Sequence, residues 1–254
     1  MQQLSVVIIC KNEAGVIGNT LASLRGLTDD VIVYDNGSTD ETVLAAREAG
    51  ARVFIGEWEG FGKTKSKANG QAKYDWVLSL DADEMIDHEL KNKLLSLKLA
   101  DEKEVYKLRF RNFLGNKMLK YGEWGNDAHV RLFNRHVVHW NNEAVHENLI
   151  IPPGCTIKLI REGFVLHRTM KDLADYAQKM VKYAMLSADK YYDQGKRSSF
   201  FKIRISPLFN FLNYFILKLG FLDGYEGYVC AKMTAHYTFL KYARLKEKWK
   251  INSK

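Results

Sequence analysis

The chain has 254 residues, of which 46% are hydrophobic, and it contains only 3 Pro and 18 Gly. This composition predicts one large folded domain, or one domain with an appendage, and argues against a disordered or fibrous protein. The three cysteines (Cys10, Cys155 and Cys230) are widely separated, which argues against a disulfide framework or a zinc site and favours a reducing compartment. No basic segment precedes the first apolar run, so we expect no secretory signal.

The net charge of +8 is concentrated near the C-terminus. Residues 196–254 contain 12 Lys and Arg against 3 Asp and Glu, a balance of +9, so residues 1–195 carry −1. Such asymmetry indicates a nucleic acid or an anionic membrane surface as a partner. A basic face that is only solvated is the alternative.

The first hundred residues alternate between apolar β-branched runs and segments with helical spacing. Strands are expected at 4–10, 31–34, 52–55 and 76–80. Helices are expected at about 16–24, from Ser38 to Gly50, at 63–73 and at 87–99, with Ser38 and Glu41 at capping-box spacing. This order predicts an α/β fold with a mostly parallel sheet and helices on both faces. No G-x-G-x-x-G motif follows the first strand, which argues against a dinucleotide-binding dehydrogenase.

Polar side chains follow three of these strands: Asn12 and Glu13 the first, Asp35 the second, and Asp81, Asp83 and Glu84 the fourth. The carboxyl ends of parallel strands in a doubly wound sheet converge on one crevice. Clustered carboxylates repel each other unless a cation lies between them, and Mg²⁺ or Mn²⁺ bound together with substrate phosphates is the simplest such cation. A solvated acidic turn is the alternative.

After residue 100 the pattern changes. Strands are expected at 105–110, 130–133, 157–160 and 164–167, a loop over the crevice at 112–127, and helices at 173–188 and 227–250. Residues 200–222 are apolar and aromatic, but they are interrupted by Pro207 and Gly220 and are only marginally long enough to span a bilayer. We expect this segment to lie on a membrane surface, and packing against the main domain is the alternative.

Three motifs in this order resemble family 2 glycosyltransferases of the GT-A fold: 6–13 (VVIICKNE), 35–40 (DNGSTD) and 81–83 (DAD). More closely, the chain resembles the bacterial lipopolysaccharide core glucosyltransferases, through Asp75-Trp76, Glu84, Val145-His146-Glu147, and His167 ahead of a helix with Tyr176, Lys179 and Tyr183. The resemblance covers about residues 4–190. It implies a GT-A domain at 1–195, with a nucleotide-binding half (1–100) and an acceptor-side half (101–195), followed by a helical, basic and apolar extension at 196–254.

The resemblance implies an inverting transfer of a hexose, glucose in this subgroup, from a UDP-sugar to a lipopolysaccharide core acceptor. Asp83 resembles the ligand of the divalent metal, and Asp81 resembles a contact to the ribose or sugar of the donor. Asp35 resembles the residue that reads the base, where a carboxylate accepts from uracil N3–H; a role at the start of a helix is compatible with this. Further donor-side candidates are Asn12, Glu13, Lys63, Lys67 and Asn69, although helix capping or plain solvation would also explain the first four.

Glu147 lies in the region where the family carries its catalytic base. Many relatives have an acidic pair there, whereas the neighbour here is His146. His167 is a candidate for a second metal ligand or a phosphate contact, with a structural role as the alternative. Tyr121 and Trp124 are candidates for stacking on the acceptor sugar, with packing within the loop as the alternative.

The expected partners are a UDP-sugar, a lipid-linked saccharide and an anionic membrane surface, which places the protein on the cytoplasmic face of the inner membrane. Nucleic acid is not expected, because no helix-turn-helix or RNP-like motif is present and apolar runs interrupt the basic tail. Three alternatives stay open: a non-catalytic membrane-surface protein on the same scaffold, a glycosyltransferase with another lipid-linked or polysaccharide acceptor, and a sugar-phosphate nucleotidyltransferase. The last would be expected to have a glycine-rich loop after the first strand, which Lys11–Gly15 does not supply.

Overall fold

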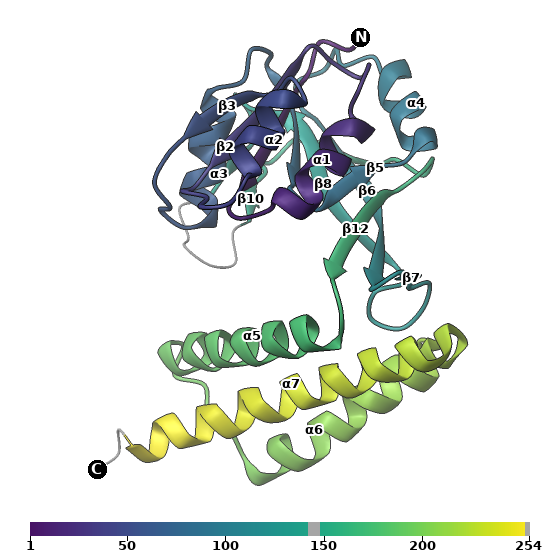
Figure 1. Ribbon diagram of the computed structural model, residues 1–254. Coiled ribbons are helices and arrows are strands. Elements are labelled where there is room, and N and C mark those ends of the chain that lie inside the picture. Colours follow the sequence, from purple (N-terminus) through teal and green to yellow (C-terminus); the bar gives the residue numbers. More distant parts are fainter. Residues whose placement is uncertain (142–147, 252–254) are drawn as a thin grey trace. The chain divides into compact units, whose positions relative to one another are not determined.

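The computed structural model describes residues 1–141 and 148–251, and it contains two compact units (Figure 1). Unit 1 comprises Met1–Phe110 and Asp127–His167, and unit 2 comprises Arg111–Asn126 and Arg168–Lys254. This division differs from the predicted boundary at residue 195. Helix α5 (Leu173–Asp193) belongs to unit 2 because it packs along α7 (Gly224–Ile251).

The first part of unit 1 alternates strands and helices as predicted. Its elements are β1 (Ser5–Cys10), α1 (Ala14–Ser23), β2 (Asp30–Asp35), α2 (Thr42–Glu48), β3 (Arg52–Ile55), α3 (Phe61–Gly70), β4 (Trp76–Asp81), β5 (Glu84–Ile86) and α4 (His88–Ser96). The later strands are β6 (Glu104–Leu114), β8 (Asp127–Asn134), β9 (His139–Trp140), β10 (Leu149–Ile150), β11 (Thr156–Leu159) and β12 (Val165–Met170).

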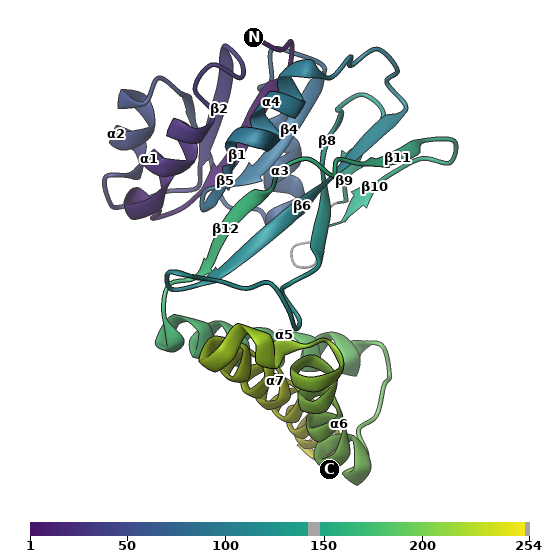
Figure 2. The ribbon, with the colours of Figure 1, turned by 90° about the vertical axis from the view of Figure 1, so that its right-hand side faces the viewer.

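The main sheet has the strand order β3-β2-β1-β4-β8-β6-β12-β5 (Figure 2). Strands β3, β2, β1 and β4 pair in parallel, whereas β8 joins β4 and β6 in antiparallel fashion. This mixed sheet with flanking helices confirms the predicted α/β fold class.

Successive residues of β1 face two different cores, because side chains alternate across a strand. Val6 and Ile8 pack with Ile17 of α1 and Leu90 of α4 on one face. Val7 and Ile9 pack on the other face, where α3 contributes Ala68. Burial on both faces explains why the strand has a continuous apolar run instead of an alternating pattern.

The register of the parallel strands brings the predicted polar tips to one edge. Cys10 lies opposite Asp35, and Ile9 lies opposite Asp81. The last residues of β1, β2 and β4 therefore end at the same level, so the predicted convergence of these strand ends is confirmed.

Two local predictions are wrong. Ser38 and Glu41 do not form a capping box, because α2 begins at Thr42 and the hydroxyl of Ser38 instead donates to Asp35 at the end of β2. The predicted loop at 112–127 begins as strand, because β6 continues to Leu114 and pairs with β7 (Lys117–Met118). The sequence did not indicate this longer strand, because Asn112 is a polar residue at an inward position of β6. It is fully buried and donates to the carbonyl of Trp124 at 3.4 Å.

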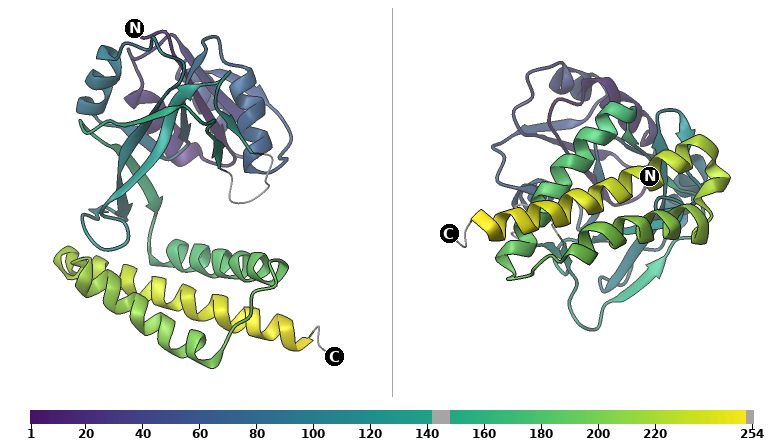
Figure 3. Two further views of the ribbon diagram at one scale, coloured as in Figure 1. Left: turned by 180° about the vertical axis from the view of Figure 1, so that it is seen from behind. Right: turned by 90° about the horizontal axis from the view of Figure 1, so that it is seen from below.

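Unit 2 is built mainly from helices. Helix α7 runs beside both α5 and α6 (Phe200–Leu212) (Figure 3). A π-helical turn (Asn213–Leu217) and a 3₁₀ turn (Gly220–Asp223) connect α6 to α7. Within the described residues no single helix is long and apolar enough to cross a membrane, although the bent pair Phe200–Leu217 and Gly220–Ile251, at 70°, passes on length and composition.

Candidate active site

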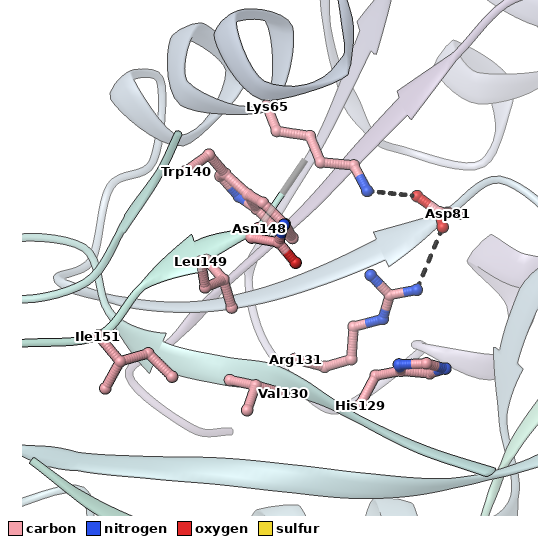
Figure 4. A pocket seen from close by; sticks show the side chains of 9 residues that line it. All are labelled: Lys65, Asp81, His129, Val130, Arg131, Trp140, Asn148, Leu149 and Ile151. Atoms are coloured by element: carbon pink, nitrogen blue, oxygen red, sulfur yellow. Dashed lines mark hydrogen bonds and ion pairs between the residues drawn. The ribbon is translucent and has the colours of Figure 1, made fainter. Parts of the chain in front are cut away.

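A pocket of about 390 Å³ lies beside the carboxyl end of β4 (Figure 4). Its lining includes Lys65 from α3, Asp81 from β4, Arg131 from β8 and Trp140 from β9. Asn148, Leu149 and Ile151 lie on the side opposite Asp81. The pocket therefore combines charged groups at the sheet edge with apolar and aromatic walls, as small-molecule sites commonly do.

Asp81 is held between two cations. The Nζ atom of Lys65 lies 3.1 Å from one carboxylate oxygen, and an Nη atom of Arg131 lies 3.1 Å from the other. Lys65 is itself buried, and its ammonium group lies over the indole ring of Trp140, 4.7 Å from the ring centroid. These contacts fix the orientation of the Asp81 carboxylate, which keeps 35% of its side chain exposed.

Glu84 supports this arrangement from within the protein. Its side chain is fully buried, forms an ion pair with Arg131, and accepts a hydrogen bond from the backbone N–H of Asp81 at 3.0 Å. Arg131 thus bridges two carboxylates, one of them fully buried. Glu84 acts as a positioning residue for the acidic turn instead of lining the pocket.

The two carboxylates have opposite pKa shifts. Burial alone would raise the pKa of Asp81, but the charges of Lys65 and Arg131 outweigh it and hold the pKa well below its usual range. Burial raises the pKa of Glu84, and the charge of Asp81 adds to this, although Arg131 acts in the opposite direction. Asp81 is therefore an anion throughout the physiological pH range.

Asp83 lies next to His167. Strand β12 pairs antiparallel with β5, with His167 opposite Glu84. This pairing brings the imidazole Nε2 to 3.5 Å from a carboxylate oxygen of Asp83. Burial would lower the pKa of His167, but its hydrogen bond with Asp83 and the neighbouring carboxylates Glu84 and Asp81 raise it.

These residues fit a divalent metal that also binds a substrate. Both oxygens of Asp81 are engaged by Lys65 and Arg131, whereas Asp83 and His167 keep 26% and 21% of their side chains exposed. In residues 1–141 and 148–251, no three His, Cys, Asp or Glu side chains are grouped to hold a metal ion. Because Mg²⁺ is commonly held by one or two carboxylates together with substrate phosphates and water, the Asp83 carboxylate is sufficient on the protein side, and His167 would join it in its neutral form.

Asn12 and Asp35 hold the loop that follows β2. Asp35 is fully buried and accepts from the backbone N–H groups of Gly37 and Ser38 at 3.0 and 2.9 Å. Asn12 has a positive φ of 57°, and its side-chain oxygen accepts from the N–H of Thr39 at 2.8 Å. The segment 36–39 is thereby tied to both strand ends at the edge shared with Asp81.

A family model described as Glycosyl transferase family 2 matches residues 5–135, more than half of the chain. The chain belongs to this family. The match spans the strand ends of β1, β2 and β4 together with Lys65 and Arg131, so the charged side of the pocket lies within the matched residues, whereas Trp140, Asn148 and Leu149 lie after them.

Relatives of this family 2 glycosyltransferase cover nearly the whole chain. An uncharacterised glycosyltransferase from Rickettsia typhi is 29% identical over 97% of this chain and 88% of its own length. LpsC from Rhizobium meliloti, a lipopolysaccharide core biosynthesis glycosyltransferase, is 29% identical over 99% of this chain and 94% of its own. Among solved structures, Staphylococcus aureus TarS (1–349) has a TM-score of 0.49 at 15% identity, covering 99% and 92% of the two chains.

In this glycosyltransferase, the lysine of α3 that contacts Asp81 is Lys65, not the predicted Lys63 or Lys67. Lys63 and Lys67 are exposed, and Lys67 forms an ion pair with Glu59. Lys65, two positions from each, faces the pocket. Asn69 is buried on the same helix, but it lines a separate pocket of about 190 Å³ with Arg135 and His136.

The remaining candidates lie elsewhere. Glu13 precedes α1 without a side-chain cap, and its N–H donates to the hydroxyl of Thr42 at 2.8 Å. In unit 2, Trp124 packs against Tyr176 with 6.5 Å between ring centroids, whereas Tyr121 is 38% exposed. Glu147 lies outside the described residues, which end at 141 and resume at 148.

Sequence reasoning missed Lys65, Arg131 and Trp140. A signal for Arg131 was present, because a charged residue interrupts the otherwise apolar strand 130–133 and must find a partner if that strand is buried. For Lys65, the small residues Gly62, Ala68 and Asn69 mark the inward face of α3. The spacing of four between Lys63 and Lys67 correctly indicated a shared face, but that face is exposed.

Proposed function

We propose that this family 2 glycosyltransferase transfers glucose from a UDP-sugar to an acceptor in the lipopolysaccharide core, with inversion at the transferred carbon. The observation that carries the proposal is the pair Asp81 and Asp83 at the end of β4, beside a pocket that contains Lys65 and Arg131. A departing nucleoside diphosphate gains negative charge, and fixed cations beside it stabilise the transition state. The acceptor class is supported by the full-length similarity to LpsC.

The donor would be held by residues of unit 1. Asp83 and His167 would bind Mg²⁺ or Mn²⁺, which when bound supplies counter-charge to the diphosphate. Asp81, anionic and fixed by its two cations, would accept hydrogen bonds from a ribose or sugar hydroxyl. Trp140 would offer an apolar wall to the nucleotide or the sugar ring.

The transfer step requires a base on the face of the sugar opposite the diphosphate. Glu147 would take the proton of the acceptor hydroxyl as that oxygen forms its bond to the anomeric carbon. The bond between this carbon and the diphosphate oxygen breaks, and UDP leaves with the electron pair. One displacement of this kind inverts the anomeric configuration.

A panel of UDP-sugars assayed on core-truncated lipopolysaccharide tests the proposal. We expect UDP release and hexose incorporation with UDP-glucose in the presence of Mg²⁺ or Mn²⁺, and loss of both after chelation by EDTA. Hydrolysis of the donor without acceptor addition serves as the background. If the protein binds UDP but transfers no hexose to any truncated core, the acceptor assignment is wrong.

Replacing Lys65 with methionine is expected to raise the KM for the UDP-sugar by about tenfold, since one charge-assisted contact to the donor is removed. Methionine keeps the length and the apolar stem of the side chain, which limits the loss of packing against Trp140. The matched controls are Lys63→Met and Lys67→Met, which make the same chemical change on the exposed face of α3. Steady-state kinetics and thermal unfolding of the three variants are the measurements.

The three variants also show which lysines of α3 bind the donor. If Lys63→Met or Lys67→Met raises the KM while Lys65→Met leaves it unchanged, the exposed lysines bind the donor, as the sequence predicts, and Lys65 has only a structural role. Equal melting temperatures across the series would show that the comparison concerns binding and not folding.

A further inference from the structure

Helix α6 of unit 2 carries an uncovered apolar stripe. Neither α6 nor the π-helical turn that follows it contains a buried residue. Beyond the first residue of α6, five large apolar side chains are between 41% and 73% exposed: Phe201, Ile205, Leu208, Phe209 and Leu212. Their spacing of four, three, one and three residues places them on one face of the helix. We call this face the α6 stripe.

The opposite side of α6 is attached to α7. The amide of Asn210 donates to the hydroxyl of Thr238 at 2.7 Å. The ring of Phe211 packs edge-on against Tyr228, with 5.9 Å between ring centroids. Because Asn210 lies about half a turn away from the α6 stripe, these contacts determine the rotation of α6 and leave the stripe uncovered within unit 2.

The apolar surface continues through the bend after α6. Leu217 and Tyr225 are 71% and 70% exposed. The bend is sterically determined, because a Cβ atom on Gly220 would lie 2.5 Å from the carbonyl oxygen of Tyr214 and one on Gly227 would lie 1.9 Å from the carbonyl oxygen of Gly220. The close backbone contacts at the two glycines fix the bend between α6 and α7. The exposed apolar side chains on both sides of the bend form one patch, and an exposed patch of this kind marks an interaction site.

The charge around this surface is mainly positive: Asp223 at the end of the bend is buried, and Glu226 is the acidic residue beside Tyr225. Residues 194–222 contain no Asp or Glu but five cations: Lys196, Arg197, Lys202, Arg204 and Lys218. Near the start of α6, a pocket of about 390 Å³ is lined by Arg197, Ser198, Lys246, Trp249 and Lys250. The guanidinium of Arg197 lies over the ring of Trp249, 4.8 Å from its centroid. Tryptophan beside cations is the combination that anchors proteins at the headgroup level of a bilayer.

We propose that the α6 stripe and the bend after it form a docking surface for an anionic lipid bilayer, with the stripe among the acyl chains and the flanking cations at the lipid phosphates. An amphipathic helix with a basic border lies in the plane of the interface in this way. A second copy of the chain is a poorer occupant, because a two-fold contact through this face would bring the five cations of each copy together. This proposal rests on unit 2 alone and does not depend on the donor or the acceptor.

Vesicle flotation of the full-length protein tests the surface. Vesicles of phosphatidylcholine alone are compared with vesicles that also contain phosphatidylglycerol, at low and high salt. We expect strong binding to the anionic vesicles and weaker binding to the neutral ones. High salt should reduce binding to the anionic vesicles, because the flanking charges are screened.

Two variants separate the apolar from the charged contribution. Ile205→Ser/Phe209→Ser is expected to weaken binding to both kinds of vesicle by at least about tenfold. Lys202→Gln/Arg204→Gln is expected to weaken binding roughly tenfold to the anionic vesicles only. The matched control is Leu44→Ser/Ile157→Ser, which removes two apolar side chains of unit 1 that are 55% and 54% exposed, and it should bind as the unchanged protein does.

Three results would overturn the proposal. The first is equal flotation of Ile205→Ser/Phe209→Ser and the unchanged protein. The second is failure of the unchanged protein to bind either kind of vesicle. The third is a concentration-dependent dimer in sedimentation that Ile205→Ser/Phe209→Ser abolishes while vesicle binding persists, which would assign the stripe to a second copy. Far-UV circular dichroism and thermal unfolding establish that each variant is folded.

Discussion

Glu147→Gln is expected to reduce the turnover number for sugar transfer by about 10²- to 10⁴-fold, the usual contribution of a general base. Glutamine preserves the shape of the side chain but cannot take the proton of the acceptor hydroxyl. The KM for the UDP-sugar should change little, because the proposed donor contacts come from Asp81, Asp83 and Lys65. Initial rates at saturating donor and acceptor provide the measurement.

Glu143 offers a matched control for this experiment. It lies four residues before Glu147 in the same segment, so Glu143→Gln makes an identical chemical change nearby. We expect this variant to retain transfer within about twofold. If Glu143→Gln abolishes transfer and Glu147→Gln does not, the base has been assigned to the wrong residue. If neither changes the rate, the base lies outside this segment.

Arg131→Met is expected to lower the free energy of unfolding by about 3–5 kcal/mol, because it leaves the buried carboxylate of Glu84 without its cationic partner. Asp81 would lose one of its two cations at the same time, which should also raise the KM for the donor. Urea unfolding gives the first quantity and steady-state kinetics give the second.

Two further variants show whether the pairing itself is responsible. Arg135→Met removes a guanidinium directly after the same strand. Its carboxylate partner Asp75 is 3.9 Å away and well exposed, and the guanidinium also donates to the carbonyl of Asn69 at 3.2 Å, so a loss of about 1 kcal/mol is expected. Adding Glu84→Gln to Arg131→Met should recover part of the lost stability, since an amide is less costly to bury than an unpaired carboxylate. A double variant as unstable as the sum of its parts would argue against the ion pair as the cause.

The fold of the first hundred residues was predictable from local patterns. The β-branched run at 4–10 indicated burial on both faces, and the alternation of strands and helices indicated a parallel sheet. The two wrong predictions failed because a side chain has another hydrogen-bond partner than the one its local pattern suggests. Ser38 has the right spacing to cap a helix, yet its hydroxyl donates to Asp35, three residues earlier at the end of β2. Asn112 looks like a loop residue, yet it is buried in β6 and donates to Trp124.

The site was predictable as a location but not as a set of contacts. The acidic residues after β4 were found because strand ends converge in sheets of this kind. Lys65 and Arg131 were missed because local spacing does not say which face of α3, or which side chain of β8, meets Asp81. That information resides in the packing of α3 against Trp140 and in the pairing of β4 with β8.

The division of the chain into interleaved units has a consequence for how this protein could be modified. Unit 2 combines residues 111–126 with residues 168–254, so the polypeptide passes from one unit to the other three times. Asp223 accepts from the backbone N–H groups of Lys120 and Tyr121 at 2.9 and 2.8 Å, which joins the inserted segment to the C-terminal helices. A chimera between two relatives must therefore exchange both segments together. A graft of the C-terminal helices alone would separate Asp223 from the backbone N–H groups of Lys120 and Tyr121.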